Sequence, residues 1–473
     1  MTSRAALLAV ALVACRENPS KLDGVAAAKP AASTKPAFPT TFEADAVDVW
    51  VAAEMAERGA VGMSLVVIEG GKVVLAKGYG KARGDGNELV TADTPFALGS
   101  VSKQFLCTAA YMLVDKGQLA MTDSIAKWYP NATRAADITL ADLGGHTAGY
   151  RDYYPLDYVD TRMQKPIAPD DLIAQYAAMP LDFEPRARWS YSNTGFVLLA
   201  RVVEKVSGVP YSKLLEEQIW KPLGMTASIT RPATAASGHV SFLLDGAKPA
   251  PFEAEGWLFG AGDIWASAND VAKWDLALLD GKLLSPESHR ALATARMLAN
   301  GKSSGYSCGW YVGMNRNELV LQHGGWVGGF HTRNVIVPRT KSAVIVLTND
   351  EYANVTGIAD KILGLLTAEL AAPIVSGPPA GEAARDHILE LQRGALDRGK
   401  LGEDLSAYYD DARVAAAAAK LRALGPPTVT VTSRDERGAL EVTHLSIAFP
   451  SKTFNATMFR SPDGKIRQLL FEN

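Results

Sequence analysis

The 473-residue sequence lacks the patterns that carry metal or nucleic-acid chemistry. Its seven histidines are scattered, and neither an HExxH pair nor a CxxC pair occurs, so a metal site has no support. There is no run of basic residues, and the formal net charge is −3, so the electrostatic pattern of a nucleic-acid-binding protein is also missing. We therefore expect no metal, no cofactor and no nucleic-acid partner.

Long hydrophobic runs are missing as well, and the one near the N-terminus is short. Residues 5–13 are apolar, whereas a membrane-spanning helix needs about 20 such residues. With Arg4 before it and small residues after it, this run is typical of an export signal. Leu12-Val13-Ala14-Cys15 resembles the bacterial lipobox, in which the cysteine is lipidated; the alternative is an ordinary signal peptide with an incidental cysteine. Because Arg16 follows instead of Asp, we expect Cys15 to anchor the exported chain at the outer membrane, facing the periplasm.

Cysteine is too scarce for a disulfide-rich scaffold. Besides Cys15, only Cys107 and Cys308 occur, and both lie in apolar segments. We expect two buried thiols and no disulfide framework.

The length of the chain fits two domains, and composition places their boundaries. We predict a signal peptide over 1–14, a lipid-anchored flexible linker over 15–42, a catalytic domain over 43–373 and a small domain of unknown role over 374–473. In the catalytic domain, turn signals at 69–71 and 338–340 predict two hairpins, and 318–325 predicts a further strand. Helical periodicity is found over 103–116, 196–206 and 268–280, the last with Asn269 as its cap.

These elements predict an α/β fold of the α+β type. The two β-rich ends of the catalytic domain should pair into one antiparallel sheet flanked by helices, with a helical subdomain beside it and a cleft between them. In the C-terminal region, helical stretches over 383–397 and 412–423 precede alternating strands. This order predicts a small α+β domain with one helical layer on a curved antiparallel sheet.

Three short motifs combine a nucleophile with proton-transfer groups. Ser-x-x-Lys occurs at Ser100–Lys103 and at Ser124–Lys127, but only Ser100 begins a helical apolar period, so Ser124 is interpreted as a helix cap. On the first helical turn, Ser100 and Lys103 share a face, as a nucleophile and its base must.

The other two motifs follow at Tyr191 and His323. Tyr-x-Asn occurs at Tyr191–Asn193, Tyr129–Asn131 and Tyr352–Asn354, and only the first lies in a loop entering an apolar helix. His323-Gly324-Gly325 ends an apolar strand, where the glycines let a ligand approach the backbone; a polar turn is the alternative interpretation.

In this order and spacing, the motifs resemble the serine β-lactamase and penicillin-binding protein family, in its class C-like branch, over about residues 43–370. That branch also contains D-Ala-D-Ala carboxypeptidases, D-aminopeptidases and esterases. The resemblance implies that Ser100 is the nucleophile and that Lys103 and Tyr191 together carry out the proton transfers. It also implies that His323 occupies the position of the third motif. It further implies that Asn193 binds the acyl side chain, and that the strand edge at Gly325 and Trp326 binds substrate, with the N–H groups of Ser100 and Trp326 as the oxyanion hole. Either an uncharged Lys103 or a Tyr191 phenolate can act as the base.

The third motif departs from the β-lactamase pattern, which has Lys-Thr-Gly there. Loss of that permanent cation weakens carboxylate recognition, so we expect a serine hydrolase acting on esters or on D-amino-acid-containing peptides and amides. Class C β-lactamase activity is one alternative, and a non-catalytic, membrane-tethered sensor of penicillins or wall fragments is another. A nucleophile elbow at Ser303 (Gly301-Lys-Ser-Ser-Gly305) is disfavoured, because a helix-like segment precedes it and a strand-like one follows. Trp257, Trp326 and Tyr150 are expected to line the cleft.

Overall fold

The computed structural model describes residues 36–472 except 85, 157, 242–245, 316–317, 368–374 and 438–439. The export signal and Cys15 lie outside the described residues, so their assignments stay predictions. Within the described part of the chain, no helix has the length and apolar character needed to cross a membrane.

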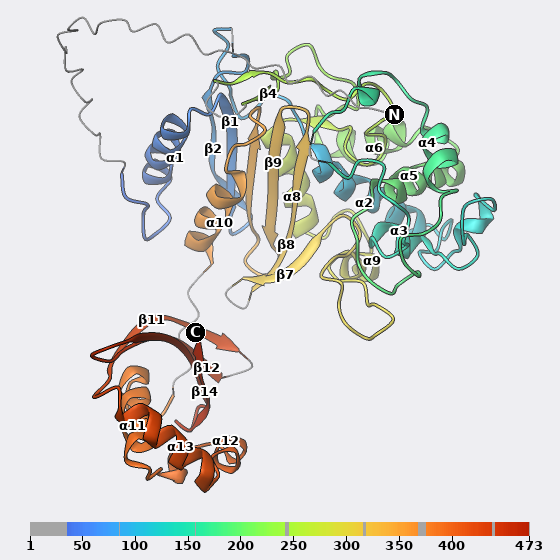
Figure 1. Cartoon of the computed structure of the whole chain (residues 1–473). Coiled ribbons are helices and arrows are strands. Elements are labelled where there is room, and N and C mark those ends of the chain that lie inside the picture. Colours follow the sequence, from blue (N-terminus) through green and yellow to red (C-terminus); the bar gives the residue numbers. More distant parts are fainter. Residues whose placement is uncertain are drawn as a thin grey trace, which may run out of the picture.

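A six-stranded antiparallel sheet forms the centre of the catalytic domain (Figure 1). Its strands, in spatial order, are β2 (Lys72–Gly80), β1 (Gly62–Glu69), β10 (Ser342–Thr348), β9 (Phe330–Val337), β8 (Glu318–Val327) and β7 (Tyr311–Asn315). β1 pairs with β10, so Met63 lies opposite Thr348. The predicted pairing of the two ends of the domain is therefore confirmed, as are both hairpins.

Both faces of the sheet are covered by helices, which explains why β1 and β10 are almost entirely apolar. On one face, α1 (Ala44–Arg58) and α10 (Val355–Leu366) pack against Leu65 and Val67. On the other, Val66 and Ile68 join the core that contains α8 (Ala268–Leu279) and the helical subdomain.

The helical subdomain lies on the right in Figure 1. Its helices are α2 (Ser102–Asp115), α3 (Leu140–Gly144), α4 (Pro169–Tyr176), α5 (Asn193–Ser207), α6 (Tyr211–Leu215), α7 (Lys221–Leu223) and α9 (Pro286–Leu292). Short elements complete the domain: β3 (Phe96–Ala97), β4 (His239–Val240), β5 (Lys248–Pro249), β6 (Trp265–Ala266), and the single turns η1 (Gly99–Val101), η2 (Ile125–Lys127), η3 (Arg162–Gln164) and η4 (Glu216–Trp220).

One predicted cap is wrong. Asn269 lies inside α8, and Ser267 is the N-cap residue, accepting a hydrogen bond from the backbone N–H of Asp270. The Asp270 side chain accepts from the Ser267 backbone in return, so the two form a capping box. This reciprocal pair outcompetes the single amide that Asn269 offers.

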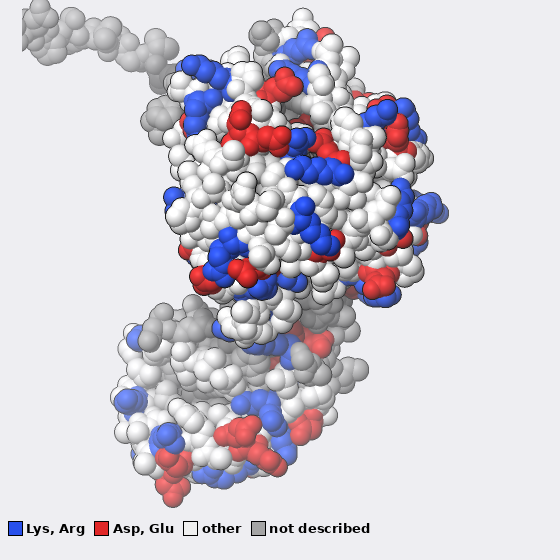
Figure 2. Space-filling view, turned by 90° about the vertical axis from the view of Figure 1, so that its right-hand side faces the viewer, with Lys and Arg blue, Asp and Glu red and all other residues white. Residues whose placement is uncertain are grey.

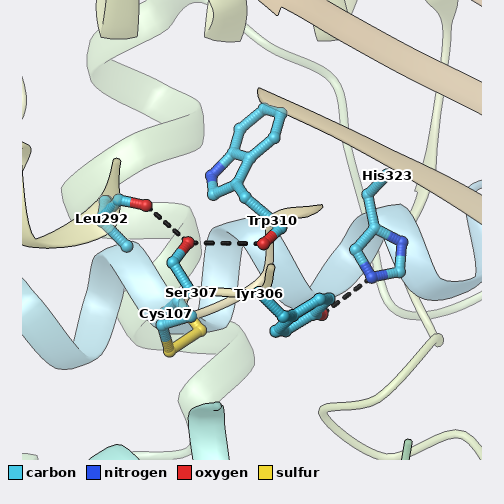
Figure 3. The surroundings of a disulfide bond; sticks show 7 residues. Cys107, Leu292, Tyr306, Ser307, Trp310 and His323 are labelled. Atoms are coloured by element: carbon cyan, nitrogen blue, oxygen red, sulfur yellow. Dashed lines mark hydrogen bonds between the residues drawn. A yellow bond between two sulfur atoms is a disulfide. The ribbon is translucent and has the colours of Figure 1, made fainter. Parts of the chain in front are cut away.

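The expectation of two free thiols is also wrong, because Cys107 and Cys308 form a disulfide with Cα atoms 5.6 Å apart (Figure 3). Both residues are buried, as expected, but the apolar segments that hide them pack on each other. The partners are separated by 201 residues, and composition carries no information about such a long-range contact.

The C-terminal region has a separate core, confirming the predicted helical layer on an antiparallel sheet (Figure 1). The sheet has the order β11 (Thr428–Arg437), β12 (Leu440–Ala448), β13 (Thr453–Arg460) and β14 (Ile466–Glu472). Its helices are α11 (Ala380–Arg393), α12 (Glu403–Tyr408) and α13 (Asp411–Arg422), with the turn η5 (Arg398–Lys400).

Candidate active site

Ser100 and Lys103 lie where the turn η1 runs into α2. Lys103 is fully buried, and its Nζ lies 2.9 Å from Ser100 Oγ, 2.8 Å from Asn193 Oδ1 and 2.6 Å from the Ala261 carbonyl oxygen. Ser102, the third polar residue of this stretch, points elsewhere and accepts a hydrogen bond from the N–H of Ile264. The predicted nucleophile and its partner are thus in direct contact.

The surroundings of Lys103 determine where its lone pair points when it is uncharged. The oxygens of Asn193 and Ala261 only accept hydrogen bonds, so they hold two of its N–H groups. A deprotonated Lys103 therefore directs its lone pair at Ser100 Oγ, which can donate. Burial lowers the pKa of Lys103 to about 7, against the attraction of Asp152 and Asp263, which raises it.

Tyr191 contacts the nucleophile as well. Its hydroxyl donates to Ser100 Oγ at 2.8 Å, and its ring packs on the buried His146 with ring centroids 4.1 Å apart. Burial raises the pKa of Tyr191 well above its usual value of 10, so the phenol stays protonated at neutral pH. Of the two bases that the motif leaves open, this environment favours Lys103.

Asn193, the first residue of α5, is held by the half-buried carboxylate of Asp152. Its backbone N–H lies 3.0 Å from Asp152 Oδ1, and its side-chain Nδ2 lies 3.2 Å from each Asp152 oxygen. These bonds fix the orientation of the amide, so that its oxygen faces Lys103. Asp152 thereby positions the lysine through Asn193.

His323 lies at the third-motif position and is buried. Its Nδ1 lies 2.6 Å from the Gly324 carbonyl oxygen, which can only accept, so Nδ1 carries the proton. Nε2 then accepts from the Tyr306 hydroxyl at 2.8 Å (Figure 3). Burial and the charge of Lys103 lower the pKa of His323 to about 3, so the imidazole is neutral, with both nitrogens already engaged.

The strand edge beside Ser100 depends on small residues. A Cβ on Gly325 would lie 1.9 Å from the Leu98 carbonyl oxygen, so only glycine fits there. Gly99 has a φ of +54°, and a Cβ on it would lie 3.0 Å from the Trp326 nitrogen. This close approach brings the Trp326 N–H next to the turn that carries Ser100, as an oxyanion hole requires.

A cleft of about 850 Å³ contains these groups. Its lining includes Ser100, Tyr150, Arg151, Asp152, Tyr154, Asp182, Tyr191, Asn193, Tyr311, His323, Gly324, Gly325, Trp326, His331 and Arg333. Tyr150 and Trp326 line it as expected. Trp257 does not, since its side chain is buried and its Nε1–H donates to the Lys165 carbonyl oxygen.

The competing motifs have structural roles. Ser124 caps η2 by accepting from the N–H of Ala126, and Asn354 caps α10. Ser303 is exposed and lies between α9 and β7, so it lacks the strand-turn-helix context of a nucleophile elbow.

Several site residues were not predicted: Asp152, His146, Tyr306, Ala261 and Arg333. Asp152 and His146 belong to residues 138–154 (ITLADLGGHTAGYRDYY), and Ala261 belongs to residues 260–274 (GAGDIWASANDVAKW); both stretches resemble the family and were the available signal. Tyr306 and Arg333 carry no motif of their own. Among the described residues, no group of three or more His, Cys, Asp or Glu side chains is arranged to hold a metal.

The charge distribution of the surface is mixed. On the face in Figure 2, Lys and Arg side chains are interspersed with Asp and Glu between large uncharged areas.

The structure has a helical subdomain beside an antiparallel sheet, and three motifs converge on one cleft: Ser-x-x-Lys, Tyr-x-Asn and the strand-edge motif at His323. This arrangement defines the class of β-lactamase-fold serine hydrolases. The chain belongs to this family: the family model described as "Beta-lactamase" matches residues 47–369.

Curated relatives come from several branches of the family. The chain is 27% identical to penicillin-binding protein 4* of Bacillus subtilis (strain 168) over 61% of this chain and 68% of the relative. It is also 27% identical to the D-alanyl-D-alanine-carboxypeptidase/endopeptidase AmpH of Escherichia coli (strain K12), over 71% of this chain and 91% of the relative.

Solved structures share the fold at lower identity. The octameric penicillin-binding protein homologue from Pyrococcus abyssi superposes with a TM-score of 0.62 at 21% identity, covering 91% of this chain and 99% of that one. A D-stereospecific amidohydrolase from Streptomyces sp. superposes with a TM-score of 0.59 at 23% identity, covering 70% of this chain and 100% of that one. A class C β-lactamase superposes with a TM-score of 0.57 at 23% identity, covering 68% of this chain and 96% of that one.

Proposed function

We propose that this protein hydrolyses D-amino-acid-containing peptides and amides, or esters, through an acyl-enzyme on Ser100. The observation that carries the proposal is the three-way contact at Ser100 Oγ, with Lys103 Nζ at 2.9 Å and the Tyr191 hydroxyl at 2.8 Å. A serine hydroxyl is a poor nucleophile until a neighbour takes its proton, and both neighbours needed for proton transfer are within hydrogen-bond distance.

In the proposed reaction, uncharged Lys103 takes the Ser100 proton while Oγ bonds to the substrate carbonyl carbon. The N–H groups of Ser100 and Trp326 stabilise the resulting oxyanion, typically by about 3–4 kcal/mol per donor. When the bond to the leaving group breaks, Tyr191 donates its hydroxyl proton to the departing nitrogen or oxygen, and the proton on Lys103 replaces it. Water then attacks the acyl group, with proton transfers in the reverse order, and releases the acid.

Relatives support this substrate class. AmpH is named for D-alanyl-D-alanine carboxypeptidase and endopeptidase activity, and the Streptomyces enzyme for D-stereospecific amide hydrolysis. β-Lactamase activity is the alternative, since a class C β-lactamase shares the fold.

Covalent labelling with a fluorophosphonate tests the nucleophile. Wild-type protein should be labelled on Ser100, and Ser100→Ala should abolish both labelling and hydrolysis of a D-alanyl amide. Ser124→Ala is the matched control: it should lose about 0.5–2 kcal/mol of stability as a missing cap but keep full labelling. Label on any residue other than Ser100 would refute the proposal. Faster turnover of a cephalosporin than of D-alanyl amides and esters would favour the β-lactamase alternative.

We also propose that the chain is exported and tethered by a lipid on Cys15 at the outer membrane, on the periplasmic side. The apolar run over 5–13 supports this location, and so does the disulfide, because disulfides persist in oxidising compartments. Cys15→Ser should move the protein from the salt-washed membrane fraction to the soluble fraction; retention in the membrane would contradict the anchor.

A further inference from the structure

A second cavity shares one wall with the Ser100 cleft. Its volume is about 900 Å³, which is within the range of small-molecule sites. Ala261 lines the Ser100 cleft, Asp263 lines the second cavity, and Leu258 lines both. The segment that contains these three residues therefore separates the two spaces, and its Ala261 carbonyl oxygen is the one that binds Lys103.

The lining of the second cavity combines apolar walls with an excess of acidic groups. The apolar part includes Ile167, Ile229, Phe252, Phe259 and Trp265. Four acidic side chains line the cavity against two basic ones: Glu204, Glu253, Glu255 and Asp263 against Arg201 and Arg231. This excess favours a cationic ligand over an anionic one.

Both arginines are engaged within the protein. Arg201 forms ion pairs with Asp170 at 2.6 Å and with Glu204. Arg231 donates to the Ala236 carbonyl oxygen at 3.1 Å. These contacts use the positive charges of the cavity, so they do not offset the acidic groups that remain.

The carboxylate of Asp263 is poorly satisfied by the protein. Its Oδ2 accepts from the Gly260 N–H at 3.4 Å, and its Oδ1 is buried without a hydrogen bond. The Tyr211 hydroxyl is also buried without a hydrogen bond, and burial together with the charge of Asp263 raises the pKa of Tyr211 well above 10. A buried polar atom without a partner costs free energy, and an ammonium group has three N–H donors with which to satisfy both oxygens.

The charge of Asp263 also acts on the catalytic lysine. Burial lowers the pKa of Lys103 to about 7, and the charges of Asp152 and Asp263 oppose this change. Asp152 lines the Ser100 cleft, whereas Asp263 lines the second cavity, so a ligand there alters the charge balance at Lys103 without entering the cleft. The other titratable groups coupled to Lys103 or Asp263 are His146, Tyr153, Tyr211 and His323.

We propose that the second cavity is a regulatory site for a small organic cation, an ammonium group on an apolar or aromatic body, which pairs with Asp263. The binding goes beyond the proposed hydrolase function, and only the effect on rate rests on that function. A positive charge beside Asp263 cancels the attraction that keeps Lys103 protonated. The bound cation therefore increases the fraction of Lys103 that is uncharged and able to take the Ser100 proton.

Matched probes test the binding: 2-phenylethylammonium and the neutral 2-phenylethanol, each titrated calorimetrically into the full chain at about pH 7. The wild type should bind the ammonium more tightly than the alcohol. Asp263→Asn should weaken ammonium binding about 10- to 100-fold and leave alcohol binding within about twofold, since a charge-assisted hydrogen bond is lost. Equal affinity for both probes, or tighter binding of 3-phenylpropanoate, overturns the inference.

Added bulk locates the bound probe. Ala168 is exposed and lines the second cavity, so Ala168→Trp should weaken the binding of both probes. Leu156 is exposed and lines the Ser100 cleft, so Leu156→Trp is the matched control and should change neither affinity. The opposite pattern would place the probe in the Ser100 cleft and overturn the inference.

The effect on rate is measured with a neutral ester. At about pH 6, saturating 2-phenylethylammonium should raise wild-type kcat/KM at least about twofold, whereas at about pH 8.5 Lys103 is already uncharged and the rate should not change. Asp263→Asn should show no activation at either pH. Binding that depends on Asp263 but gives no activation at the lower pH overturns the regulatory role. If the wild type hydrolyses no ester and Ser100 is not labelled by a fluorophosphonate, the proposed function fails, whereas the calorimetry still decides whether the cavity is a cation site.

Discussion

The burial of Lys103 is the feature on which the chemistry depends at the scale of single residues. An ordinary lysine is charged at pH 7 and cannot accept a proton, but burial lowers the pKa of Lys103 to about 7. We therefore predict that kcat/KM on a neutral ester rises with pH, with a midpoint near 7, because the deprotonated amine is the active form. His323 should add no second transition between pH 5 and 9, since its pKa is about 3. A pH–rate profile of the wild type measures both.

The same profile distinguishes the two possible bases. Tyr191→Phe should lower kcat/KM at every pH and leave the midpoint in place, because Tyr191 is protonated throughout this range. A midpoint that moves or disappears in Tyr191→Phe would instead identify the phenol as the group that titrates.

A second prediction concerns Asp263, whose carboxylate raises the pKa of Lys103. The pKa of Asp263 is itself raised to about 6 by burial, so the group is mostly charged at pH 7. Asp263→Asn removes this attraction and should shift the midpoint of the profile to lower pH. Asp182→Asn is the control: Asp182 also lines the cleft, but its carboxylate is paired with Arg151, so the midpoint should not move. Equal shifts in both variants would point to a general charge effect.

The sequence predicted the site residues that belong to short motifs and missed those supplied by distant segments. Ser100 and Lys103 are one helical turn apart, so local periodicity was enough to put them together. Arg333 meets Gly324 only because β8 and β9 pair in one register, and that pairing depends on the folded sheet.

At the scale of elements, the disulfide links the catalytic helix α2 to the turn that precedes β7. Cys107 lies on α2, and Cys308 lies in the turn after Tyr306, whose hydroxyl donates to His323 (Figure 3). The same turn packs against the start of α2, where a Cβ on Gly309 would lie 2.8 Å from the Lys103 carbonyl oxygen. The disulfide therefore holds the turn against the helix that carries the base.

We predict that Cys308→Ser lowers the free energy of unfolding by about 2–5 kcal/mol, because the cross-link joins residues 201 positions apart and restricts the unfolded chain. Denaturant unfolding of wild type and variant measures the change, with the reduced wild type expected to behave like Cys308→Ser. If reduction destabilises the wild type but leaves Cys308→Ser unaffected, the disulfide is the cause. No difference between reduced and oxidised wild type would contradict the prediction.

Secondary structure was predictable where the signal is local. The hairpins at 69–71 and 338–340 and the helices α2, α5 and α8 follow from turn residues and apolar periodicity. The N-cap of α8 was misplaced by two residues, because a capping box competes with a single Asn and the two patterns overlap in sequence. The disulfide was missed for another reason, since nothing in the sequence near either cysteine indicates its partner.

At the scale of the whole molecule, the hydrophobic cores divide the chain. Two clusters, one on each face of the large sheet, are built from residues between 38 and 366. The third cluster is built from residues between 380 and 469 and belongs to the C-terminal sheet and its helices. The sequence indicated this division through the Pro/Gly-rich segment near 374–381, because such composition rarely continues a helix or a strand.

Because each region buries its own apolar surface, the catalytic domain should not need the C-terminal one for its chemistry. We predict that a chain ending at Thr367 keeps kcat/KM on a neutral ester within about twofold of the full chain. The reason is that Ser100 and Tyr191 line the cleft, while Lys103 lies on α2, whose apolar residues belong to the first core. Ester hydrolysis and fluorophosphonate labelling of both chains measure this directly.

A chain ending inside α10, at Ile358, is the contrasting variant: it removes Ile362 and Leu363 from the core on one face of the sheet and should be strongly destabilised. If the chain ending at Thr367 unfolds or loses activity as the shorter one does, the C-terminal region contributes to the active domain and the two are not independent.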